Sequence, residues 1–76
     1  MRDLLTFLVR GLVENPDEVE VAELEEDGDL VYEITVADED LGRVIGRDGR
    51  VANALRSVAK AVAVRLERRV IVDILD

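Results

Sequence analysis

A chain of 76 residues suits one small domain, because chains usually divide only when they grow well beyond about 150 residues. The sequence has neither cysteine nor histidine, which excludes disulfides, thiolate zinc sites and imidazole catalysis. Its composition, 49% hydrophobic and 37% charged, is that of a folding chain, and no apolar run is long enough to span a membrane. We therefore expect one soluble, cytoplasmic domain over residues 1–76, without a signal peptide.

The charge is distributed unevenly along the chain. The net charge is -8, yet residues 43–69 hold eight basic and two acidic residues, and so carry +6. The other residues hold two basic and 16 acidic residues, and so carry -14. A basic segment within an acidic chain leaves two interpretations open: a surface for nucleic-acid phosphates, or an ordinary solvated helix.

The first half of the chain predicts a helix followed by a β-hairpin. Apolar residues at helical spacing predict a helix over roughly residues 2–14, and Asn15-Pro16 ends it. Alternating apolar and polar residues predict antiparallel strands over 18–26 and 30–36, joined by an Asp-Gly turn. Within these elements we expect Phe7 to lie in or beside the core and Tyr32 to point inward.

The second half predicts a helix pair and a last strand. A short helix that ends at Gly46 is indicated by Leu41, Val44 and Ile45. An apolar arc predicts a second helix over 50–67, and the β-branched residues of 70–75 predict a strand. A helical crossover permits parallel pairing of the second and third strands. We expect an α+β fold of order α-β-β-α-α-β, with a three-stranded mixed sheet, three helices on one face and the other face open to water.

The motif Gly46-Arg47-Asp48-Gly49 lies between the two helices of that pair. Such a turn directs backbone amides outward, where they suit a phosphate oxygen, and glycine lets a sugar-phosphate backbone approach closely. Arg47 and Arg50 would add charge-assisted contacts. The alternative is purely structural: a helix C-cap at Gly46 and a tight turn at Gly49.

The element order, the run of residues 41–50 and the closing run 68–74 resemble a type II KH domain. More specifically, the chain is similar to the KhpA family of small bacterial single-domain KH proteins. The resemblance implies that single-stranded RNA, typically about four nucleotides, lies along the Gly-x-x-Gly loop in a groove between the helix pair and the sheet edge. It implies an RNA site made of Gly46, Arg47, Asp48, Gly49 and Arg50, with Arg43 nearby and Val36, Val44 and Ile45 lining the groove. It also implies a homodimer and pairing with a larger KhpB-type KH protein.

Asp48 departs from the pattern usual in that family, because it places an acid beside the expected phosphate. The same carboxylate is suitably placed to be the N-cap of the helix over 50–67. Cap and phosphate would then compete for the same amides.

The sequence offers little for catalysis. Ser57 is the only serine, and no imidazole exists to activate it. The acidic residues of the hairpin are expected to be exposed to solvent and not to take part in catalysis. We expect no enzyme activity, no metal and no cofactor. Two hypotheses remain: a protein that binds single-stranded RNA, with an RNA chaperone role as its finer form, and a protein-interaction or dimerisation module with a residual RNA site.

Overall fold

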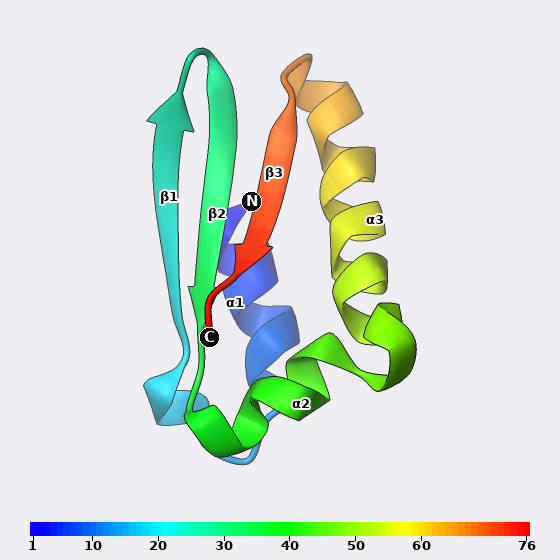
Figure 1. Ribbon diagram of the computed structural model, residues 1–76. Helices are drawn as coiled ribbons and strands as arrows, with labels where there is room; N and C mark the ends of the chain where they lie inside the picture. Colours follow the sequence, from blue (N-terminus) through cyan, green and yellow to red (C-terminus); the bar gives the residue numbers. More distant parts are fainter.

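A three-stranded sheet forms one layer of the structure, and the helices pack on one of its faces (Figure 1). The structure is a computed structural model that describes all 76 residues. The strands are β1 (Glu20–Glu26), β2 (Asp29–Thr35) and β3 (Val70–Ile74). The central strand β2 pairs antiparallel with β1 and parallel with β3. The predicted α+β class, element order and strand arrangement are confirmed.

The first helix, α1 (Arg2–Arg10), is shorter than the predicted span of 2–14. It ends early because the amides of Glu14 and Asn15 donate to the carboxylate of Asp40, at 3.1 and 3.0 Å, instead of continuing the helix. A 3₁₀ turn over Pro16–Glu18 follows, so β1 begins two residues later than predicted.

The helix pair consists of α2 (Leu41–Ile45) and α3 (Arg50–Leu66), with 3₁₀ turns over Asp38–Asp40 and Arg47–Gly49. The last turn of α3 closes at Glu67, whose left-handed φ of 56° turns the chain into β3. The crossover from β2 through both helices to β3 places α3 beside β3, the free edge of the sheet (Figure 1).

The core lies between the sheet and the helices. Its buried side chains come from all three helices, from the inward positions of β2 and β3, and from the residues just before β1 and just after β2: Leu5, Val9, Val19, Tyr32, Ile34, Val36, Val44, Leu55, Ala59 and Val72. Tyr32 points inward as predicted, and its hydroxyl donates to Glu23 at 2.6 Å. Burial, together with the bond to Glu23 and its charge, raises the pKa of Tyr32 to about 12.

The expectation for Phe7 is wrong, because its side chain is 75% exposed. Leu5 and Val9 are the residues of α1 that reach the core. Phe7 lies two residues from each of them, which is roughly 200° around a helix, and therefore points away from the sheet.

Asp40 is the one buried charged residue. Besides the two amides, its carboxylate accepts from the side-chain amide of Asn15 at 2.9 Å and from Arg43 at 3.2 Å. Burial by itself would raise the pKa of Asp40, but these hydrogen bonds and the charge of Arg43 hold that pKa below its ordinary value. Asp40 therefore ties the segment after α1 to the start of α2, and so helps to position the helix pair.

Candidate nucleic-acid interface

The Gly46–Gly49 loop joins α2 to α3 in a strained backbone conformation. Gly46, Asp48 and Gly49 have φ values of 76°, 56° and 75°. A Cβ on Gly46 would lie 2.5 Å from Cγ2 and 2.9 Å from the backbone nitrogen of Val51, whereas a Cβ on Gly49 would meet only Asn53, at 4.0 Å. Gly46 is thus required by the fold itself, and Gly49 mainly by its left-handed φ.

The predicted capping role of Asp48 is wrong. Gly49 is the N-cap of α3, and no side chain accepts a hydrogen bond at that helix start. An N-cap residue normally adopts an extended backbone, while Asp48 adopts a left-handed one that turns the chain. Its exposed carboxylate therefore leaves the first turn of α3 uncapped.

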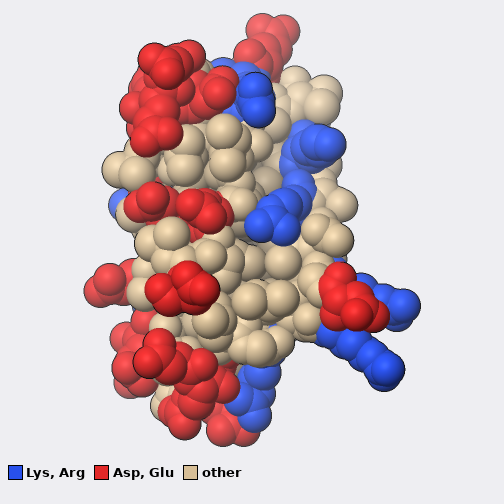
Figure 2. All heavy atoms as spheres, in the orientation of Figure 1, with Lys and Arg blue, Asp and Glu red and all other residues tan.

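The basic residues around the loop differ in what they contact. Arg47 and Arg50 are exposed, and neither forms an ion pair within the chain. Arg43, in contrast, pairs with Glu14 at 3.0 Å and with Asp40 at 3.2 Å. Figure 2 shows basic side chains projecting at the lower right, where Figure 1 places the turn between α2 and α3. Arg47 and Arg50 are free to meet a ligand, and Arg43 is engaged in holding α2.

The three apolar residues expected to line the groove lie in different environments. Val44 has no exposed surface and belongs to the core, so its predicted lining role is wrong. An amphipathic five-residue helix has to bury one face, and Val44 is the buried residue of α2. Val36 is 9% exposed and also packs in the core, whereas Ile45 is 38% exposed and presents an apolar surface next to the loop.

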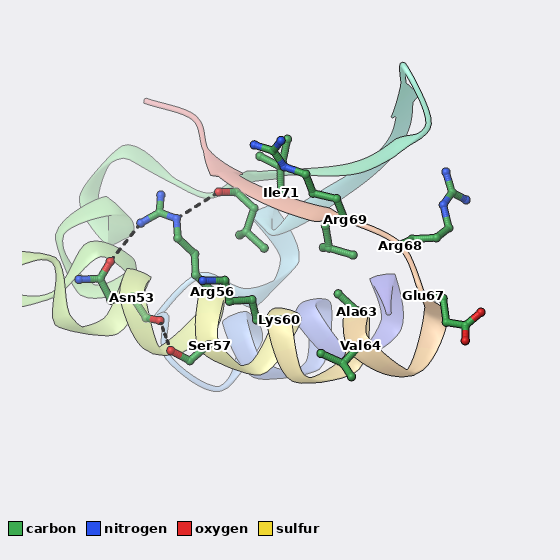
Figure 3. A pocket seen from close by; sticks show the side chains of 12 residues that line it. Asn53, Arg56, Ser57, Lys60, Ala63, Val64, Glu67, Arg68, Arg69 and Ile71 are labelled. Atoms are coloured by element: carbon green, nitrogen blue, oxygen red, sulfur yellow. Dashed lines mark hydrogen bonds between the residues drawn. The ribbon is translucent and has the colours of Figure 1, made fainter.

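A groove of about 860 Å³ runs between α3 and β3 (Figure 3). We call it the α3–β3 groove. Its lining from α3 includes Asn53, Arg56, Ser57, Lys60, Ala63 and Val64, and its lining around β3 includes Arg69, Val70, Ile71 and Val72. Val64 is 77% exposed there. The groove lies between one helix of the predicted pair, α3, and the edge strand β3, and no residue of α2 or of the Gly46–Gly49 loop lines it.

Arg56 crosses this groove. Its Nε donates to the carbonyl of Val72 at 3.3 Å, and its Nη1 donates to Oδ1 of Asn53 at 3.4 Å (Figure 3). The guanidinium group therefore lies against the free edge of β3, where backbone groups face no further strand. Lys60 lies one turn farther along α3 and forms no ion pair.

Sequence reasoning missed Asn53, Lys60 and Arg69 as site residues. A signal was present, because Asn53, Arg56 and Lys60 follow the spacing i, i+3 and i+7, which places them on one face of α3. Arg69 could not be placed from the sequence, since its position depends on how the chain leaves α3.

The molecule divides into an acidic side and a basic side. Figure 2 shows acidic side chains gathered on the left, over β1 and β2, and basic side chains toward α3 and β3. No three acidic side chains come close enough together to hold a metal ion. No helix combines the length and the apolar character that crossing a bilayer requires.

Comparison with known proteins shows the family of the chain. Residues 2–74 match the family described as KhpA/KhpB, KH domain. The chain is 45% identical to the RNA-binding protein KhpA of Clostridium acetobutylicum over 75 residues, covering 99% of this chain and all of the relative. It is 43% identical to that of Halalkalibacterium halodurans over all 76 residues, covering the whole of both chains. No solved structure matches the chain.

Proposed function

The chain belongs to the KhpA/KhpB family of KH domains, and on this premise we propose that it binds single-stranded RNA without catalysis. The observation that carries the proposal is the order of these residues along α3. The unpaired Arg47 and Arg50 lie at the start of the helix, and Asn53, Arg56 and Lys60, which line the α3–β3 groove, follow within three turns. Phosphates need cations and backbone donors, and bases need an adjacent cleft.

In this arrangement one phosphate lies against the Gly46–Gly49 loop. Arg47 and Arg50 supply the positive charge. The absence of a Cβ atom at Gly49, where a Cβ would meet only Asn53, leaves room for the sugar-phosphate backbone. Ile45 offers an apolar surface beside the loop. The following nucleotides lie along α3, where their bases meet Asn53, Arg56 and the edge of β3.

A charge reversal in the loop tests the proposal. Arg47→Asp places a second acid beside Asp48 without changing either glycine, and should weaken binding of a short unstructured RNA by about tenfold or more. Arg10→Asp is the matched control, because Arg10 is also exposed but lies at the end of α1. Fluorescence anisotropy in low salt measures both. Equal affinities for Arg47→Asp and the parent protein would exclude the loop.

A second candidate function, as a dimerisation or interaction module, is supported by an apolar depression of about 210 Å³ between α1 and α3. It is lined only by hydrophobic residues: Leu8, Leu12, Val51, Ala54, Leu55 and Val58. Surfaces of this kind mark contact sites in many proteins. It would serve self-association or a KhpB-type partner, and the RNA chaperone role would then belong to the assembly.

Val58→Asp separates this candidate from RNA binding. Val58 is 38% exposed on α3, so a charge there should disrupt an apolar contact while leaving the loop intact. Sedimentation of the parent and the variant measures self-association, and anisotropy measures RNA affinity. A parent protein that associates and does not bind RNA would favour the interaction module over the first proposal.

A further inference from the structure

The outer face of the sheet, opposite the helices, carries a row of three aliphatic side chains. Leu24 pairs with Val31 across β1 and β2, and Val31 pairs with Ile71 across β2 and β3. The neighbouring residues Tyr32 and Val72 point into the core, so these three point away from it. We call Leu24, Val31 and Ile71 the aliphatic row. Although no helix covers it, Val31 is only 7% exposed because the other two flank it.

Acidic residues border the aliphatic row on both sides. The adjacent row across the sheet is Ala22, Glu33 and Asp73, and on the other side Glu26 pairs with Asp29. Figure 2, which views this face, shows acidic side chains along the sheet with uncharged atoms between them. Residues 14–40 include 13 acids and no basic residue. Among the acids that border the row, only Asp29 forms an ion pair, with Arg69 at 3.9 Å.

This combination specifies the chemistry of a partner. An acidic border repels nucleic acid and anionic membranes, and attracts Lys and Arg. If the sheet carried acidic side chains alone, their role could be to keep strands of other chains from pairing with it. The aliphatic row works against that role, because it gives another chain an apolar surface to bind. We propose that the outer face docks a protein segment that presents aliphatic side chains between Lys and Arg residues.

The proposed surface is separate from the proposed RNA site. Leu24 lies on β1, with β2 between it and β3, and only Ile71 belongs both to the aliphatic row and to the α3–β3 groove. The two proposals therefore stand independently, and a cationic segment on the outer face leaves the Gly46–Gly49 loop accessible.

The probe for a test is a short fluorescent peptide of alternating Lys and Leu, compared with a peptide in which Ser replaces each Leu. Anisotropy at near-physiological salt should show the Leu peptide binding about tenfold more tightly, since burial of one aliphatic side chain is enough for that factor. Equal affinity of the two peptides would overturn the proposal, because charge attraction alone would explain the binding.

Two matched pairs of variants locate the contact. Leu24 is 39% exposed and Leu4, on α1, is 38% exposed, so Leu24→Ser should lower the affinity for the Leu peptide about tenfold and Leu4→Ser should leave it unchanged. Glu33→Lys should lower the same affinity about fivefold, and Glu18→Lys, on the 3₁₀ turn before β1, should have a smaller effect. Circular dichroism checks that each variant is folded.

Two further results would overturn the proposal. Losses of equal size for Leu24→Ser and Leu4→Ser, or for Glu33→Lys and Glu18→Lys, would mean that the peptide has no preferred site. Self-association of the protein alone that disappears in Leu24→Ser would make the occupant a second copy of this chain rather than a cationic segment.

Discussion

Two turns of this protein have nearly the same backbone but very different surroundings. Asp27 and Gly28, at the tip of the hairpin, have φ values of 51° and 87°, and Asp48 and Gly49 have φ values of 56° and 75°. Both turns therefore consist of a left-handed Asp followed by a glycine. The first joins two strands, while the second opens a helix.

The difference between the turns lies in charge and packing. Glu25, Glu26 and Asp29 surround the hairpin turn, and its nearest cation, Arg68, is already paired with Glu25 at 3.1 Å. The Gly46–Gly49 loop contains the unpaired Arg47, is followed by the unpaired Arg50, and precedes the part of α3 that lines the α3–β3 groove. The comparison teaches that an Asp-Gly turn does not by itself make an anion site, and that free cations and an adjacent groove do.

The largest difference should appear when each turn loses a glycine. Gly46→Ala forces a Cβ against Val51 in a backbone region open essentially to glycine, and should cost about 3 to 5 kcal/mol in the free energy of unfolding. Gly28→Ala meets nothing within 4 Å and should cost only about 1 to 2 kcal/mol for its positive φ. Chemical denaturation measures both. Equal losses would show that packing at Gly46 does not distinguish the turns.

The next largest effect concerns Asp40, which links the acidic segment to the helix pair. Asp40→Asn removes a buried charge that accepts four hydrogen bonds, and should lower the melting temperature at neutral pH by on the order of 10 °C. Asp38→Asn, two residues earlier and exposed, is the control and should change little.

The pH dependence of stability provides a second test of the role of Asp40. The pKa of Asp40 is lower in the folded chain than its ordinary value of 3.8, so the unfolded chain takes up the proton first. The stability that Asp40 contributes is therefore complete above about pH 4 and is lost as the pH falls through the folded-state pKa. Asp40→Asn should flatten this acid limb of the stability curve. An unchanged acid limb would mean that other carboxylates produce it.

The smallest predicted effect is a difference in RNA affinity between changes at Asp48 and at Asp27, the aspartates of the two turns. Asn tolerates the left-handed conformation as Asp does, so Asp48→Asn and Asp27→Asn should both keep their stability. Removing the acid beside a bound phosphate should raise RNA affinity about fivefold in Asp48→Asn and not in Asp27→Asn. Weaker binding by Asp48→Asn would instead indicate that Asp48 accepts a hydrogen bond from a base or a 2′-hydroxyl group.

Periodicity alone predicted most of the fold. The alternation in β1 and β2, the apolar arc of α3 and the helical crossover fixed the sheet order, because each places one apolar face against the core. The end of α1 could not be predicted, since it depends on a carboxylate 25 residues farther along the chain. Local spacing also could not show that Phe7 points outward, because its neighbours Leu4, Leu5 and Leu8 are equally apolar.

The candidate site was predicted less completely than the fold. The Gly46–Gly49 loop is visible as a motif in the sequence, which also places one free arginine, Arg47, within it and the other, Arg50, directly after it. The cap at Asp48 was wrong because the backbone conformation of a four-residue turn is not encoded by residue type alone. The roles of Arg43 and Arg56 depend on partners far along the chain, Glu14 and Val72.

The most direct test of the central claim is a map of amide chemical shifts during titration with a short unstructured RNA. RNA bound as proposed should shift the amides of Gly46–Arg50, of Asn53, Arg56 and Lys60 on α3, and of β3. The amides of Asp27 and Gly28, in the turn of similar conformation, should stay in place. Shifts confined to the hairpin or to the apolar depression between α1 and α3, with none in the loop, would contradict the account.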